Sequence, residues 1–401
     1  MAKRYHKRLL ISASLLLLLT LFLAACSSGG GSNNPTPTPG TGKGSTPTTG
    51  TNATPTASLT PGVGLGPRPC PDAVKDPAHW DPIIGTQANV TKVEKVICGN
   101  LIGNPALQAL VTVRYTGTGA ILDVYVYSKI TQPNPTQLFK LQGLYKGDAK
   151  ISGYNTVLTA EVDQNSSINK NKPNAEFQQD LFREFKWSDG AGTLVPVAFG
   201  GIFPDLTRYQ AESDQAKVNQ GEDPWKLSAA TVSMRLATDL LQWPSNAQTT
   251  VVSGGGKSDL NAVVNVVSAG PPSVSIKVSL IRLEGNTNGG IWIVTSVESP
   301  NMSITAPQSL DRLTSPTTVT GKGNAFEGVI GTVKILDHLY NDIGHAQAKG
   351  AIGNGNTTFS TSVSYSSTFH GGAQEGLVVL LAANNAGGPS PAVIVKELIS
   401  A

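Results

Sequence analysis

The sequence predicts a mainly β protein with a smaller α+β part, and three observations support this prediction. Runs that alternate between apolar and polar residues recur along the chain, and turn-forming Gly, Asn and Pro separate them. Residues 224–243 instead repeat their apolar side chains every three to four positions, as a helix does. Charged residues make up 14% of the chain, below the roughly 25% of typical soluble domains, and turn-forming residues take their place.

The first 25 residues have the layout of a secretory signal. Four basic residues within positions 3–8 precede an apolar block, residues 9–25. The block runs into LAAC, which resembles the lipobox of bacterial lipoproteins and implies cleavage before Cys26 and a thioether-linked diacylglycerol on it. Two or three acyl chains would anchor the protein stably, whereas one chain binds a membrane only marginally. The alternative is an uncleaved membrane helix of barely sufficient length, and both interpretations place residues 27–401 outside the cytoplasm.

Composition divides the chain into five segments. They are the signal peptide (1–25), the lipid-attachment cysteine with a disordered Pro/Thr/Gly/Ser linker (26–66), a β-rich domain (67–203), an α+β domain (204–299) and a β-sandwich domain (300–401). The linker repeats Pro-Thr pairs and carries one charge, Lys43. It has no apolar period to bury, so it cannot offset the entropy cost of becoming ordered.

The charge of the exported part limits its partners. Without the four basic residues of the signal, 26 Lys and Arg face 27 Asp and Glu, so this part is close to neutral. Nucleic acid is therefore not an expected partner. We expect the membrane as a partner through lipidated Cys26, together with envelope proteins or cell-wall polymer. The predicted location is the extracytoplasmic face of the cell membrane.

Two cysteines follow the linker, Cys70 and Cys98. An even pair in an exported protein predicts a disulfide, and the alternative is two unpaired buried thiols. Only His79 lies nearby in the sequence, and the spacing fits no zinc pattern. We therefore expect neither a metal nor a cofactor here.

Residues 67–203 predict a β-rich domain without a recognisable family. Residues 109–115 and 121–128 alternate in polarity on either side of the turn sequence TGTG, which predicts a β-hairpin. Two further strands are predicted at 154–162 and 192–199. Residues 175–187 are ambiguous, because their first half suits a helix and their end suits a strand.

Residues 204–299 predict a helix followed by an antiparallel meander. Asp223 is the expected N-cap, with Pro224 at the first helical position. Strands are predicted at 260–268, 273–283 and 291–299. A helix on such a meander, with Trp292 and Val294 in a W-x-V pattern, resembles the cone-shaped fold of nuclear-transport-factor-2-like proteins. That fold can hold a ligand pocket, and the alternative is that Trp292 belongs to the core.

Residues 300–401 predict an all-β unit, with strands at 326–337, 357–365, 375–383 and 391–399. Short strands and regular turns over about 100 residues indicate a β-sandwich. The unit resembles the immunoglobulin-like domain of bacterial spore germination proteins. The residues that support this resemblance are Pro307, Ser315, Pro316, Val319, Gly321, Phe326, Glu327 and Gly328. The resemblance implies a binding or organising role, linked to sporulation or germination.

Alternation within residues 326–337 assigns opposite directions to the first two side chains. It predicts Phe326 in the core and Glu327 on the outside, where a carboxylate costs nothing to expose. Glu327 is therefore either a plain surface residue or a contact, to a partner or to the backbone donors of a loop. It is the one candidate partner contact in the sequence.

Three motifs suggest chemistry, and none is complete. Residues 254–258, GGGKS, resemble the end of a phosphate loop, but Val251 occupies the position of a required glycine and strands flank the motif, which predicts a hairpin turn. Residues 167–170 match Ser-x-x-Lys without its companion motifs. Residues 337–345 contain two acids and two histidines, yet they lack the glycine and final glutamate of a calcium loop, so we expect a polar loop.

These observations together predict a membrane-anchored extracytoplasmic lipoprotein that acts as a non-catalytic binding or structural module and not as an enzyme. One alternative is a carrier of a small apolar ligand, held in residues 204–299. Another is a cell-wall hydrolase, because folding can bring together carboxylates that are distant in sequence. A shifted carboxylate pair in a cleft would favour the hydrolase.

Overall fold

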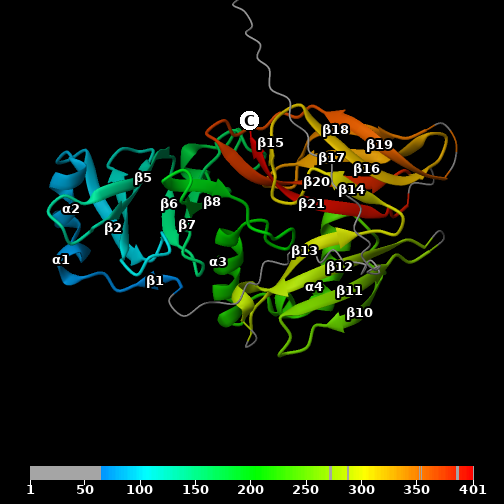
Figure 1. The fold of residues 1–401 in the computed structure, drawn as a ribbon, viewed down its shortest axis with the longest axis horizontal. Helices are drawn as coiled ribbons and strands as arrows, with labels where there is room; N and C mark the ends of the chain where they lie inside the picture. Colours follow the sequence, from blue (N-terminus) through cyan, green and yellow to red (C-terminus); the bar gives the residue numbers. More distant parts are fainter. Residues whose placement is uncertain are drawn as a thin grey trace, which may run out of the picture. The chain divides into compact units, whose positions relative to one another are not determined.

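The computed structural model shows a mainly β fold, with 46% of the chain in strands and 14% in helices (Figure 1). This confirms the predicted fold class. The structure describes residues 65–270, 273–286, 289–351, 353, 355–384 and 388–400. The predicted signal peptide, Cys26 and nearly all of the linker lie outside these residues. Within the described ranges, no helix is long and apolar enough to span a bilayer.

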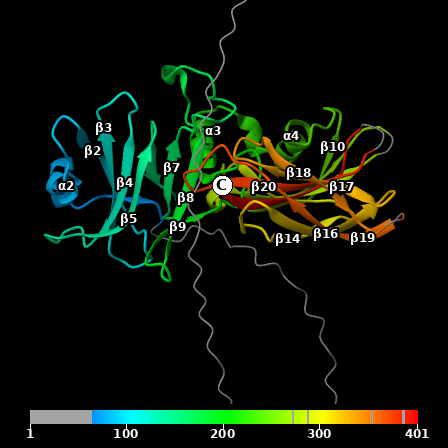
Figure 2. The ribbon, with the colours of Figure 1, turned by 90° about the horizontal axis from the view of Figure 1, so that it is seen from above.

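Residues 67–197 form two antiparallel sheets that pack face to face (Figure 2). The first sheet contains β1 (Pro67–Arg68), β2 (Thr91–Gly99), β3 (Gln108–Tyr115), β4 (Leu122–Ser128) and β5 (Thr136–Leu144). The second contains β6 (Asp148–Ile151), β7 (Val157–Glu161), β8 (Leu181–Ser188) and β9 (Thr193–Val197). Leu122 and Val124 of β4 pack with Phe185 of β8 in one buried cluster. Every strand predicted in this part is present, and the ambiguous residues 175–187 become a strand from Leu181 onwards.

Two short helices lie on the other face of the first sheet. They are α1 (Asp72–Lys75) and α2 (Pro77–Ile84). The Trp80 indole is buried with its ring centroid 5.2 Å from that of Tyr127, and its Nε1 donates to the Val74 carbonyl at 2.8 Å. A disulfide joins Cys70, just before α1, to Cys98 on β2, with 5.2 Å between their Cα atoms. The helices are thus fixed to the sheet both covalently and by packing.

A polar helix that the sequence did not predict follows β9. It is α3 (Arg208–Asn219), and the Thr207 hydroxyl caps it by accepting from the Gln210 amide at 3.4 Å. The buried side chains of α3 are Arg208, Ala211 and Val218. Because one of the three is a charged residue, the helix shows no apolar period from which it could be predicted.

The predicted long helix is divided into three parts. Its parts are the 3₁₀ turn η2 (Pro224–Leu227), α4 (Ala229–Arg235) and the π-helical turn η3 (Leu236–Leu240). Asp223 and Pro224 begin a helical turn as predicted, but this turn is η2, and the Asp223 side chain makes no capping hydrogen bond to it. α4 begins separately, where the Ser228 hydroxyl accepts from the Thr231 amide at 3.3 Å.

α4 lies on an antiparallel meander. The meander contains β10 (Gln248–Gly254), β11 (Asn261–Val267), β12 (Ser275–Arg282) and β13 (Trp292–Glu298), with the turn η4 (Leu283–Gly285) before β13. Val232 and Leu236 are fully buried, and they pack with Val264 and Val278 of the meander. Trp292 is also fully buried, which confirms the core alternative for this residue.

The C-terminal strands form a β-sandwich. They are β14 (Ser303–Ala306), β15 (Arg312–Leu313), β16 (Thr317–Ala325), β17 (Val329–Leu336), β18 (Asp342–Lys349), β19 (Gly355–Val363), β20 (Ala373–Ala382) and β21 (Ala392–Ser400). Strands β14, β16 and β19 make one sheet, and β17, β18, β20 and β21 belong to the facing sheet. Val319 and Phe359 from the first sheet pack against Val333, Val378 and Ile399 from the second.

One sheet runs from the meander into the sandwich. Its order is β10-β11-β12-β13-β21-β20-β17-β18, with β15 paired to β21, and the strands β13 and β21 meet where Val297 pairs with Ile394. In Figure 1 the red β21 and the yellow β13 are neighbours. The apolar cluster beneath α4 accordingly includes Leu377 and Val379 of β20. Residues 204–299 and 300–401 therefore share a continuous sheet and part of one core.

The disulfide yields a stability prediction. Cys70→Ala/Cys98→Ala should lower the free energy of unfolding by roughly 3–4 kcal/mol, because the unfolded chain regains the freedom of the loop that the bond closes. Urea unfolding of the variant, followed by the fluorescence of the buried Trp80, measures the loss. Wild-type protein under reducing conditions should unfold at the same urea concentration as the variant. An unchanged midpoint in both samples would contradict the bond.

Candidate functional site

The turn between β16 and β17 carries the candidate contact residue Glu327. Glu327 is exposed with a φ of 52°, and the next residue, Gly328, has a φ of 79°. The Phe326 amide donates to the Val329 carbonyl and the Val329 amide donates back, which closes a tight two-residue turn. The strand predicted from residue 326 therefore begins only at Val329. Phe326 and Glu327 are exposed at the turn, whereas Gly328 is buried and bonded to Gly350 and Gly353.

The prediction that Phe326 is a core residue was wrong. Its side chain is 52% exposed, whereas its neighbours in the interior are Ala325 and Ile330. The reason lies in the turn, because the backbone reverses directly after Phe326 and breaks the alternation of the following strand. A large aromatic residue is thus exposed beside Glu327.

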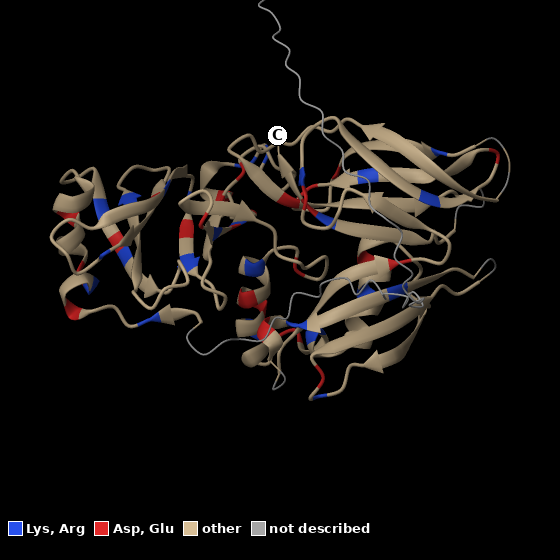
Figure 3. Ribbon diagram, viewed as in Figure 1, with Lys and Arg blue, Asp and Glu red and all other residues tan. Residues whose placement is uncertain are grey.

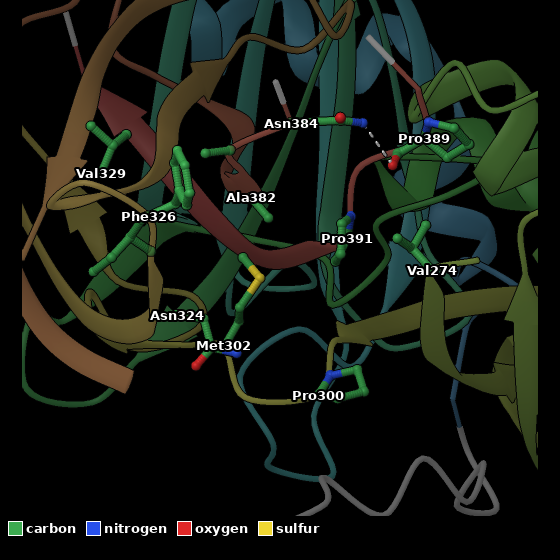
Figure 4. A pocket seen from close by; sticks show the side chains of 12 residues that line it. Val274, Pro300, Met302, Asn324, Phe326, Val329, Ala382, Asn384, Pro389 and Pro391 are labelled. Carbon is green, nitrogen blue, oxygen red and sulfur yellow. Dashed lines mark hydrogen bonds between the residues drawn. The ribbon is translucent and has the colours of Figure 1, made fainter. Parts of the chain in front are cut away.

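Phe326 lines an apolar groove of about 270 Å³ (Figure 4). The groove lies where the end of the sandwich meets the start of β12 and the segment that follows β13. Its lining residues are Val274, Pro300, Met302, Asn324, Phe326, Val329, Ile330, Ala382, Ala383, Asn384, Pro389 and Pro391. None of these side chains carries a charge, so the groove suits apolar groups.

Two asparagines provide the polar side chains of the groove. The Asn384 amide nitrogen donates to the carbonyls of Gly388 (2.7 Å) and Pro389 (3.1 Å), which holds this side chain in place. Asn324 lies near the end of β16 and is exposed. Its amide is available to pair with a backbone N–H or C=O of a bound peptide. The groove can therefore bind a chain segment, and the described residues that line it include no acid, base or nucleophile.

The acids and histidines of residues 337–345 do not converge. Asp337 accepts from the backbone amides of Leu339 and Asn341 at 2.8 and 2.9 Å and so closes a turn. Asp342 and His345 lie 3.3 Å apart on the exposed strand β18. Residues 337–341 form the expected polar loop between β17 and β18, whereas residues 342–345 belong to β18.

His338, the remaining residue of this motif, is buried. Its Nδ1 contacts the Gln374 carbonyl oxygen, and its Nε2 lies 3.6 Å from a carboxylate oxygen of Asp180. Burial lowers the pKa of His338, but the nearby Asp180 carboxylate and the contact with Gln374 outweigh this effect, and the pKa is raised. His338, which follows β17, thus lies between Gln374 of β20 and Asp180, the residue before β8.

The other two motifs are turns. Residues 254–258 connect β10 and β11, as predicted, and the Gly256 carbonyl accepts from the Arg282 guanidinium at 3.0 Å. The same guanidinium lies 4.3 Å from the Trp292 ring centroid. Ser167 of the Ser-x-x-Lys match accepts from the Asn341 side chain at 3.1 Å, and Lys170 is exposed.

Several carboxylates are buried, and sequence reasoning did not identify them. Arg208 of α3 donates to Glu184 (2.9 Å) and to Glu284 (2.8 Å), and burial raises the pKa of Glu284 to about 7. Glu375 bonds to Lys396 at 2.8 Å, and burial raises its pKa to about 7 as well. Both signs of charge are interspersed along the fold (Figure 3). Each of these carboxylates is bonded to a buried cation, which is the arrangement of a structural ion pair.

Comparison with known proteins gives no relative for this chain. No protein-family model matches it, and no curated protein matches it.

Glu397 on β21 provides a test of the buried charges. Its side chain is fully buried, and neither carboxylate oxygen has a hydrogen-bond partner within the described part of the chain. Burial, and then the negative charge of Asp311, raise its pKa to about 9. Between about pH 5 and 9 the folded protein holds a proton that the unfolded chain releases. The free energy of unfolding should therefore fall as the pH rises through this window.

Glu397→Gln should remove this pH dependence. At pH 8.5 the variant should be more stable than the wild type by about 1 kcal/mol or more, and near pH 4 the two should coincide. Urea unfolding at pH 4, 7 and 8.5 measures the difference. Glu298→Gln is the matched control, because Glu298 is half exposed and pairs with Lys277 on the surface. A stabilisation that is the same at every pH would contradict a buried, protonated Glu397.

Proposed function

We propose that this protein is a lipid-anchored extracytoplasmic lipoprotein that acts as a non-catalytic binding module. The observation that supports the anchor is LAAC at residues 23–26, at the end of an apolar block and before a Pro/Thr/Gly/Ser segment. The disulfide between Cys70 and Cys98 fits the same location, because such bonds persist in oxidising compartments outside the cytoplasm.

The groove beside Phe326 is the proposed binding site, and its proposed occupant is an extended apolar segment of a neighbouring envelope protein. An exposed aromatic residue next to Met302 and Pro300 resembles the aromatic and methionine-rich centre of protein interfaces. A volume of about 270 Å³ lies just below the roughly 300–1,000 Å³ of small-molecule pockets, which favours one or two side chains over a whole ligand. Glu327, exposed at the same turn, would contact the partner at the rim.

The residues that line the groove also bear on the biological role. Phe326, Glu327 and Gly328 belong to the motif for which residues 300–401 resemble spore germination proteins. Because Phe326 and Glu327 are exposed in a turn and do not lie in a core strand, we infer that the motif serves contact with a partner. A role in sporulation or germination remains part of this proposal.

The two alternatives have less support. The face of α4 that would cover a carried ligand is packed directly against the meander by Val232 and Leu236. Glu284 and Glu375, whose pKa values are raised, are bonded to buried cations, and neither these two nor Glu397 lines the groove. A carrier would need a cavity between α4 and the meander, and a hydrolase would need carboxylates that face an open cleft.

The anchor makes the first functional prediction. Cys26→Ser should abolish incorporation of labelled fatty acid and move the protein from the membrane fraction to the soluble or secreted fraction, because no acyl chain would then hold it. Fractionation and immunoblotting measure the shift, with Cys70→Ala/Cys98→Ala as a control that should stay in the membrane. Unchanged membrane retention of Cys26→Ser would show that the apolar block itself is the anchor.

The groove makes the second functional prediction. A photo-crosslinking phenylalanine analogue at Phe326 should form a discrete adduct in intact cells, and the crosslinked site should be an apolar segment of an exported protein. The same analogue at Lys322, exposed on β16, is the matched control and should not form it. Glu327→Arg should weaken the adduct. Identical adducts from both positions would contradict the proposed site.

The stability of Phe326 variants separates binding from folding. Phe326→Ala should change the free energy of unfolding by less than about 0.5 kcal/mol, because the side chain is largely exposed. Phe359→Ala in the sandwich core is the comparison and should cost roughly 3–5 kcal/mol. Denaturant unfolding of both variants measures the difference.

A further inference from the structure

A second hollow lies on the N-terminal sheets, far along the sequence from the groove beside Phe326. It measures about 300 Å³ and opens where α2 ends. Its lining residues are Ile84, Gly85, Thr86, Gln87, Val90, Thr91, Val113, Tyr115, Asp123 and Tyr125. Hydroxyl, amide and carboxylate groups predominate, in contrast to the apolar groove.

An aromatic row leads along the sheet to this hollow. The Trp80 and Tyr127 ring centroids are 5.2 Å apart, and Tyr127 and Tyr125 stack at 6.2 Å. Trp80, at one end of the row, belongs to α2, and this helix stops at Gly85, a left-handed C-cap. Because the helix ends there, the Tyr125 end of the row and the half-buried Tyr115 remain beside the hollow.

Asp123 forms the floor of the hollow and is 3% exposed. Its carboxylate accepts from the hydroxyls of Tyr115 and Tyr125 at 3.3 Å, from the Gln142 side chain at 2.8 Å and from the Gly143 amide at 2.9 Å. All four donors are neutral, so they solvate the negative charge without cancelling it. That charge raises the pKa of Tyr115, and burial together with the same charge raises the pKa of Tyr125 to about 12.

The hydrogen bonds to Asp123 fix what the tyrosines can offer a ligand. Each phenol hydroxyl donates its hydrogen bond to Asp123, so its oxygen can act only as an acceptor toward a ligand. The side chain of Gln87, exposed at the rim, adds a donor as well as an acceptor. The half-buried ring of Tyr115 adds apolar surface, together with the side chains of Ile84 and Val90. A ligand that matches this set carries several hydroxyl groups and apolar C–H surface.

We propose that this hollow binds one sugar unit of a neutral glycan. An anionic ligand is disfavoured because Asp123 would repel it at the floor. A cationic ligand is disfavoured because the Lys140 ammonium already lies 5.5 Å from the Tyr125 ring centroid. The volume of about 300 Å³ is at the small end for a ligand pocket, which favours a single ring of a longer chain. The site adds a glycan to the protein partner proposed above and does not depend on it.

Titration of the full chain, solubilised in detergent, with chitotriose and cellotriose tests this proposal by isothermal calorimetry and saturation-transfer NMR. At least one trisaccharide should bind saturably. Tyr115→Phe should weaken binding at least five-fold, because it removes an acceptor while keeping the ring, and Gln87→Ala should weaken it without touching the buried floor. Tyr145→Phe is the matched control, since Tyr145 packs against Phe177 outside the hollow and should keep wild-type affinity.

Three results would overturn the proposal. They are the absence of saturable binding by either trisaccharide, an equal loss of affinity in Tyr145→Phe, and binding of tetramethylammonium in place of sugars. Unchanged thermal unfolding of Tyr115→Phe shows that its loss of affinity is not a loss of folding. Photo-crosslinking at Phe326 reports on the other site, so failure of one proposal can be told from failure of the other.

Discussion

A buried ion pair between Lys396 and Glu375 fixes the position of residues 199–206 against the central sheet. Both side chains are almost completely buried, on the neighbouring strands β21 and β20, and 2.8 Å separates the charged atoms. Burying two charges costs several kcal/mol per ion unless further hydrogen bonds satisfy them. The Phe199 amide donates to Glu375 at 2.9 Å, and the Leu206 carbonyl accepts from Lys396. The segment between these two residues must therefore lie on the pair.

The segment from Phe199 to Leu206, together with the two residues that follow it, makes further hydrogen bonds to other elements. Ile202 and Phe203 exchange backbone hydrogen bonds with Val294 of β13, at 2.7 and 2.8 Å. The Tyr340 hydroxyl donates to the Ile202 carbonyl at 2.8 Å. At the end of the segment, Arg208 bonds to carboxylates of β8 and η4. These buried charged groups thus hold residues 199–208 against the central sheet.

The sequence predicted the parts of this fold that depend on local pattern. Residues 121–128 and 375–383 alternate or are continuously apolar, and both became strands because their side chains meet cores on two faces. α3 was missed because Arg208 takes a buried position that an apolar residue would normally mark. The pairing of β13 with β21 joins residues almost a hundred positions apart, and no local pattern encodes it. Phe326 was misassigned because a turn with a non-glycine residue at positive φ gives no clear signal.

The candidate sites were still less predictable. Glu327 was identified from its place in a motif, but the groove beside it needs residues from Val274 to Pro391, which only the tertiary fold brings together. Asp123 and Tyr125 lie in a run predicted simply as a strand. These two side chains line a hollow only because α2 ends before it would cover them.

The place of β21 has a consequence for how the molecule is made. A polypeptide leaves the ribosome N-terminus first, so β21 emerges after every other strand, yet it occupies the middle of the large sheet between β13 and β20. Until it arrives, the edges of both neighbours have no strand to pair with, and Glu375 has no cation. The large sheet can therefore close only after β21 has been synthesised, and the pairing of β13 with β20 through β21 is a late step in folding.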